Sequence, residues 1–164
     1  MNDALSTSAS NPAIDELLSQ FFAVQQSGKK GVARQRIEEV ERQLRACVEA
    51  EAERILVTSD LLLLASEREF DPAGAVARVM HADDLVFILS IFVEPGWQPS
   101  DPAQRQAQLR MTRLLTSYLL DHGFVSRKEL CCPLLDIRAG ISRGQAELRQ
   151  ECVSAKASSV LRSS

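Results

Sequence analysis

Apolar residues recur three and four positions apart along most of this chain, which is the spacing of one face of an α-helix. The first such stretch follows Asn11-Pro12, a typical cap and first helical position, and it stops at Ser27-Gly28. The second and longest stretch continues to Ile55. Its apolar positions are Ile37, Val40, Leu44, Cys47 and Val48. We therefore expect two amphipathic helices joined by a short link at 29–31.

The segment 85–93 (LVFILSIFV) is apolar on every side, so it has to be buried on every side. Asp83 and Asp84 stand directly before it and suit the positive end of a helix dipole. The pattern elsewhere offers no partner strand. The segment is therefore predicted to be the central helix of the protein, with a buried strand as the alternative.

Between these stretches lie shorter helical segments. Ser59-Asp60 offers a cap for the apolar run 61–64, and Pro72 opens a short helix that ends near Met80. The segment 94–99 (EPGWQP) is the clearest loop of the chain.

Two helical regions are predicted in the last third of the chain. One starts at Asp101-Pro102 and closes at Gly123, where a left-handed glycine commonly ends a helix. The other begins near Ser126, which stands three residues before a glutamate in the spacing of a capping box. Gly140 and Gly144 are expected to weaken the middle of this last helix.

These elements predict an all-α fold, a compact bundle of six or seven helices around the central helix 85–93. The length of 164 residues fits one domain, and 45% apolar residues suffice for one sizeable core. We expect a flexible tail at 1–11, a single helical domain at 12–152 and a second flexible tail at 153–164, since both ends are rich in small polar residues.

Composition narrows the function classes. The formal net charge of -3 is unusual for a dedicated nucleic-acid binder, which is commonly basic. No run of about 20 apolar residues exists to span a bilayer, and the first residues lack the pattern of a secretory signal. A cytoplasmic location is therefore expected, with all four cysteines present as thiols.

Candidates for catalysis are few, because the chain has only two histidines. His81 with Asp83 and Asp84 can be interpreted as a divalent-metal or proton-sharing site, which would make the protein a metal-dependent enzyme. Acidic residues at a helix start explain the same pattern, and we favour that interpretation.

A zinc site is the other arrangement to consider. Its ligands would be His122, Cys131, Cys132 and Cys152. Structural zinc sites prefer cysteines two to four residues apart, and adjacent cysteines with one remote cysteine fit that poorly. We predict no metal ligands, no cofactor and no catalytic residues.

A basic cluster precedes the long second helix. It consists of Lys29, Lys30, Arg34 and Arg36. Such residues can follow a phosphate backbone, although the acidic run 38–41 directly after them also fits a solvated mixed-charge face. A DNA-associated accessory or regulatory module is therefore the first alternative function.

The first 70 residues resemble the helical core-binding domain of tyrosine recombinases. The resemblance rests on the segment 14–18 (IDELL), on Phe21-Phe22, on the basic link and on the amphipathic helix to Ile55. It implies DNA binding. The recombinase constellation of arginines, a histidine region and a nucleophilic tyrosine is absent, because the sole tyrosine, Tyr118, lies on an apolar helix face. We assign no family.

The function favoured by the sequence is non-enzymatic: a helical interaction or regulatory protein that binds itself, as a homodimer, or a protein partner. The anchors would lie on the apolar face of the long helix, at one phenylalanine and at the sole tryptophan, a residue type that often anchors interfaces. They are Ile37, Val40, Leu44, Phe70 and Trp97.

Overall fold

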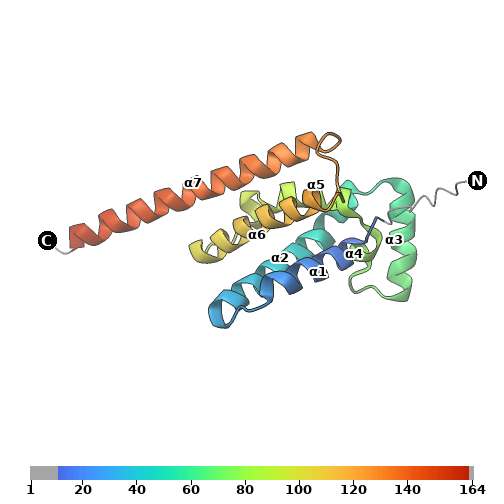
Figure 1. Cartoon of the computed structure of the whole chain (residues 1–164), viewed down its shortest axis with the longest axis horizontal. Coiled ribbons are helices and arrows are strands. Elements are labelled where there is room, and N and C mark those ends of the chain that lie inside the picture. Colours follow the sequence, from blue (N-terminus) through green and yellow to red (C-terminus); the bar gives the residue numbers. More distant parts are fainter. Residues whose placement is uncertain (1–10, 163–164) are drawn as a thin grey trace, which may run out of the picture.

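A computed structural model describes residues 11–162, and this part of the chain forms seven α-helices and no strand (Figure 1). The elements are α1 (Ile14–Gln26), α2 (Gly31–Ile55), α3 (Thr58–Phe70), α4 (Ala75–Val79), α5 (Ala82–Phe92), the 3-10 turn η1 (Pro95–Trp97), α6 (Pro102–Asp121) and α7 (Cys131–Arg162). The prediction of an all-α helical bundle is confirmed.

The helix α5 lies at the centre of the bundle. It contacts α1, α2, α6 and α7, and most of its apolar side chains are buried in one continuous core. Ile91 is half-buried, and Phe87 has 41% of its surface exposed. The segment 85–93 is therefore a central helix and not a strand, although it is covered on most sides rather than on all.

Two helix starts differ from the sequence prediction. The helix α1 begins at Ile14 rather than at Pro12, since the Ile14 amide donates to the Met80 carbonyl at 2.8 Å and Ala13 pairs with His81 in a β-bridge. The short helix α4 begins at Ala75 rather than at Pro72. The proposed starts at Asn11-Pro12 and Pro72 were wrong.

Both ends of α6 match the sequence prediction. The Asp101 carboxylate accepts the Gln104 amide at 2.9 Å and caps the start of the helix. Gly123 follows the end of α6 with a φ of 70°, a backbone conformation that L side chains rarely adopt.

Two glycines set the position of α7 against the body of the protein. A Cβ atom on Gly140 would collide with Val93, which follows α5, and one on Gly144 would lie 2.7 Å from a methyl group of Leu109 on α6. Both glycines are buried. They lower helix propensity, as expected, but they also let α7 approach α5 and α6 more closely than any other residue type allows.

The far end of α7 extends beyond the rest of the bundle (Figure 1). All side chains from residue 151 to 162 are exposed. The sequence predicted a flexible tail from residue 153, whereas the structure continues the helix to Arg162, because no glycine or proline interrupts the segment. Its flexibility stays a prediction. The predicted tail 1–11 lies outside the described residues except for Asn11.

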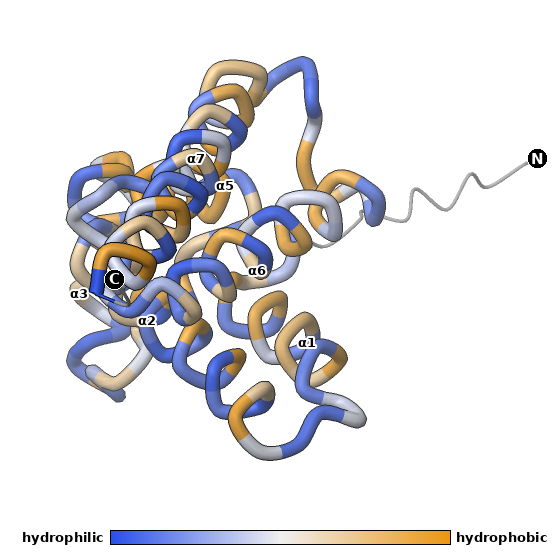
Figure 2. Tube along the Cα trace, turned by 90° about the vertical axis from the view of Figure 1, so that its left-hand side faces the viewer, coloured by the Kyte–Doolittle hydropathy of each residue, from blue (hydrophilic) through white to orange (hydrophobic). Residues whose placement is uncertain are grey.

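Apolar and polar residues alternate along α1 and α7, as the tube coloured by hydropathy shows (Figure 2). Between residues 11 and 162, no helix combines the length and the apolar character that a membrane-spanning segment needs.

Candidate functional site

Three of the five predicted partner anchors belong to the core of the chain itself. Ile37, Val40 and Leu44 expose 7%, 1% and 1% of their surface. They pack on the side of α2 that contacts α1, α5 and α6. The structure thus corrects the prediction for these residues, because their side chains are not available to a partner on this surface.

The other two anchors are accessible to different degrees. Trp97 is half-buried against the core, and its indole Nε1–H donates to Glu51 Oε1 at 3.4 Å. It therefore covers the core beneath its own loop. Phe70, at the end of α3, is 90% exposed and remains open to a partner.

The residues of the suggested metal-dependent enzyme form a helix cap. The His81 amide donates to Asp84 Oδ2 at 3.0 Å, and burial raises the pKa of the Asp84 carboxyl. Asp83 is exposed. This geometry fits the interpretation of the acidic pair as a helix start.

The suggested zinc ligands are not brought together. His122 lies against Tyr118 and Phe124, with ring centroids 4.2 and 5.8 Å away, whereas Cys131 and Cys132 are exposed at the start of α7 with their sulfurs 3.9 Å apart. Across residues 11–162, no group of three or more His, Cys, Asp or Glu side chains is arranged to hold a metal ion.

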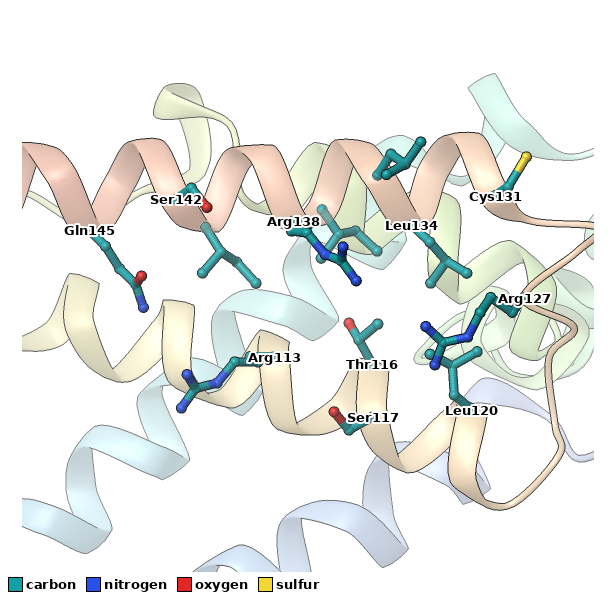
Figure 3. A pocket seen from close by; sticks show the side chains of 13 residues that line it. Arg113, Thr116, Ser117, Leu120, Arg127, Cys131, Leu134, Arg138, Ser142 and Gln145 are labelled. Carbon is teal, nitrogen blue, oxygen red and sulfur yellow. The ribbon is translucent and has the colours of Figure 1, made fainter.

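A hollow lies between α6 and the first half of α7 (Figure 3). It encloses about 600 Å³. Leu134 and Arg138 point from α7 toward α6, and Thr116 points from α6 into the gap (Figure 3). Its apolar lining residues are Leu120, Leu134, Leu135, Ile137 and Ile141. Ile137 and Ile141 expose only 2% and 8% of their surface and belong to the core, so the accessible apolar floor of the hollow comes from Leu120, Leu134 and Leu135. Polar and cationic side chains border it.

A second hollow of about 470 Å³ continues the first along the same two helices. The two share Arg113 and Gln145, so they adjoin, and we call them together the α6–α7 groove. A third hollow of about 360 Å³ lies on the other side of α6, against the ends of α1 and α2, and it shares Gln106 and Arg110 with the second. We call it the α2–α6 hollow.

Positive charge without a partner surrounds these hollows. Seven cationic side chains line them: Lys29, Arg36, Arg110, Arg113, Arg127, Arg138 and Arg149. No Asp or Glu of the described chain lines any of the three hollows. Within residues 11–162, none of the seven forms an ion pair, whereas seven of the nine other arginines do.

Sequence reasoning missed most of this groove, although the sequence carries a signal for it. From Pro102 to the end, ten Lys or Arg residues stand against five Asp or Glu residues, while the whole chain is net acidic. The total charge of -3 hides this separation.

The predicted basic cluster is divided by the structure. Lys29 and Arg36 line the α2–α6 hollow together with Arg110. Lys30 and Arg34 are exposed outside it, and Arg34 donates to Glu38 at 2.7 Å. Half of the cluster therefore joins the larger cationic surface around α6.

Comparison with models of known protein families, with curated proteins and with solved structures finds no match. The resemblance of the first 70 residues to a recombinase domain therefore gains no support, and function has to be inferred from the groove.

Proposed function

We propose that the protein is a non-enzymatic interaction module whose α6–α7 groove binds an acidic, partly apolar segment of a protein partner. One observation carries the proposal: an apolar floor bordered by arginines, with no carboxylate in its lining to neutralise them. Exposed cations without partners raise the local potential and attract an anionic ligand, and burial of the apolar floor supplies affinity. A cytoplasmic location remains our prediction.

The apolar floor favours a protein partner over nucleic acid. Leu135 at its edge is 60% exposed, and a bound phosphate backbone would leave this apolar surface uncovered. The lining of the groove contains no Phe, Tyr or Trp, the side chains on which single-stranded bases stack. An acidic segment with interspersed leucines complements both the cationic side chains and the apolar floor of the groove.

A fluorescence-anisotropy titration tests the proposal with a labelled peptide built from Glu and Leu. Arg113→Glu combined with Arg138→Glu reverses one rim charge on each wall of the groove. Each of the two arginines can form an exposed ion pair with the peptide, worth up to about 1 kcal/mol. Each reversal removes this attraction and adds a repulsion of similar size. We expect the double variant to weaken binding about tenfold or more.

The matched control is Lys30→Glu combined with Arg34→Glu, which changes the net charge equally at exposed positions outside the hollows. This variant should bind the peptide within about twofold of the parent protein, because charges beyond about 10 Å are largely screened at ordinary salt. Equal losses in both variants would show that net charge alone attracts the peptide and would overturn the assignment to the groove.

Nucleic-acid binding is the second candidate, supported by the meeting of Lys29, Arg36 and Arg110 in the α2–α6 hollow. It predicts that a labelled DNA duplex binds with an affinity that falls steeply with salt. Replacing Lys29 and Arg36 with Glu should then abolish binding. A duplex that does not bind even at low salt would remove this candidate.

Self-association remains a proposal as well, now placed on α3. Only Leu64 of this helix is buried, while Leu62, Leu63 and Phe70 are 69%, 51% and 90% exposed. Light-scattering mass across a size-exclusion peak tests it. A dimer that Phe70→Ser converts to a monomer would support it, and a monomeric parent protein at high concentration would contradict it.

A further inference from the structure

We infer that the occupant of the α6–α7 groove is an amphipathic α-helix, which lies along α6 and α7 as a third helix and presents carboxylates on both flanks of one apolar stripe. This inference rests on the proposed function and adds the conformation and the charge pattern of the bound segment.

Backbone hydrogen bonding favours a helix over an extended segment. An extended peptide carries free N–H and C=O groups that need partners when they are buried. The main chains of both walls are already hydrogen-bonded within α6 and within the part of α7 that lines the groove, and no strand edge exists within residues 11–162. The groove therefore has no strand edge to which an extended peptide could pair. A helix forms its own backbone hydrogen bonds and needs only a groove lined by side chains.

The groove has the length that a helix requires, and part of its apolar lining is accessible. Its accessible apolar surface comes from Leu135, which is 60% exposed, and from the half-buried Leu120 and Leu134, whereas Ile137 and Ile141 are buried in the core of the chain itself. The α6 wall of the groove runs from Gln106 to Leu120. Fourteen residue steps of a helix span about 21 Å, which matches about four helical turns.

The cations lie on both sides of this floor. Arg110 and Arg113 come from α6, whereas Arg138 and Arg149 come from α7. In the close-up, Arg113 lies on the α6 side of the gap and Arg138 hangs from α7 (Figure 3). A helix seated between these walls would therefore carry Glu or Asp on each flank of its apolar stripe, as flanking charges do in coiled coils.

The projecting end of α7 from a second copy does not meet this description. From Glu147 to Arg162 it carries two acidic and three basic residues, so it is weakly cationic and would meet a cationic groove. Charge complementarity therefore points to a different, acidic chain.

Three labelled peptides of identical composition, about 18 residues or five turns long, separate the two levels of the proposal. In the first, Leu recurs every three and four residues with Glu on both flanks. The second has the same residues in scrambled order without an apolar stripe. All three peptides contain one Pro, which stands at the end of the first two. The third peptide keeps the order of the first, except that this terminal Pro and one central residue exchange places.

Anisotropy gives the affinity of each peptide for the full chain, and difference circular dichroism gives the helix formed on binding. We expect the amphipathic peptide to bind about tenfold more tightly than the scrambled and proline-centred peptides, since proline breaks the helix and scrambling removes the stripe, and to gain helix signal in the complex. Arg113→Glu with Arg138→Glu should abolish this preference.

The outcomes distinguish the two failures. Equal binding of all three peptides, or binding without gain of helix, overturns the helical occupant while an anionic protein segment in the groove stands. If none of the three peptides binds, both the helical occupant and the proposed function are overturned. The same holds if a DNA duplex binds while the peptides do not.

Discussion

At the residue scale, Gly140 shows how one absent side chain positions a long helix. The helix α7 crosses Val93 at this point, and there is no space for a Cβ atom. A glycine inside a helix lowers its stability by about 1 kcal/mol relative to alanine. Here that cost is offset by the burial of apolar surface between α7 and the bundle.

We predict that Gly140→Ala destabilises the protein although alanine is the better helix former. Overpacking of a core costs about 1–3 kcal/mol, which exceeds the propensity gain. Gly144→Ala is the comparison variant. Its new methyl group would lie 2.7 Å from the end of the Leu109 side chain rather than against the β-branched Val93, so it should destabilise the protein less. Urea denaturation followed by circular dichroism measures both, and a Gly140→Ala protein more stable than the parent would contradict the close packing of α7.

The thiol of Cys47 is the second residue with a measurable consequence. Burial, followed by the charges of Glu51 and Glu94, raises the pKa of this thiol from 9.0 to about 12. The unfolded chain therefore releases the proton at lower pH than the folded chain does. Stability that is present below pH 9 is lost as the pH rises toward 12, because in that window the unfolded state binds fewer protons.

We expect the free energy of unfolding to fall from pH 9 upward by at most about 1.4 kcal/mol per pH unit from this group. Cys47→Ala should lack that slope, and the difference between its pH profile and that of the parent isolates the contribution from other titrating groups. Parallel profiles would show that Cys47 is not buried as described. Alkylation of Cys47 in the native protein as rapid as that of the exposed Cys152 would also show that Cys47 is not buried.

At the element scale, the outer end of α7 differs from the other helices. Its last turns have no buried side chain, and most helical stability in proteins comes from packing of an apolar face. The segment is therefore held in helical form only by continuity with the packed half of α7.

Removal of residues 153–164 should leave the stability of the bundle unchanged within about 0.5 kcal/mol, the usual range for surface changes. Amide hydrogen exchange of the intact chain should show fast exchange from Val153 to Arg162 and protection around Ile137 and Ile141. Slow exchange throughout 153–162 would mean that another surface covers this end.

The sequence predicts most elements because their signals are local. The apolar period of α1 and α2, the cap at Asp101 and the glycine at 123 each act within a few residues, and the structure confirms them. The start of α1 was missed because it depends on a hydrogen bond from Ile14 to Met80, far away in the chain. The close approach at Gly140 was missed for the same reason.

At the scale of the whole molecule, the distribution of charge matters more than its total. A net charge of -3 suggests an acidic protein, yet the surface around α6 carries seven cations without ion pairs among the described residues. The candidate groove could not be predicted from the sequence, because its walls come from two helices whose packing no local pattern specifies. The buried anchors on α2 were misassigned for a related reason, since an amphipathic period does not say which chain covers the apolar face.

In our proposal, the α6–α7 groove is the binding surface of this protein. The most direct test is a titration of the isotope-labelled full chain with the amphipathic Glu-Leu peptide, followed by amide chemical shifts. We predict that the perturbed amides lie on both walls, around Arg113 and Thr116 of α6 and around Arg138 and Ile141 of α7, while those of α3 and of Lys30 stay unchanged. Perturbations confined to α3 or to the region of Lys30, or none at saturating peptide, would contradict it.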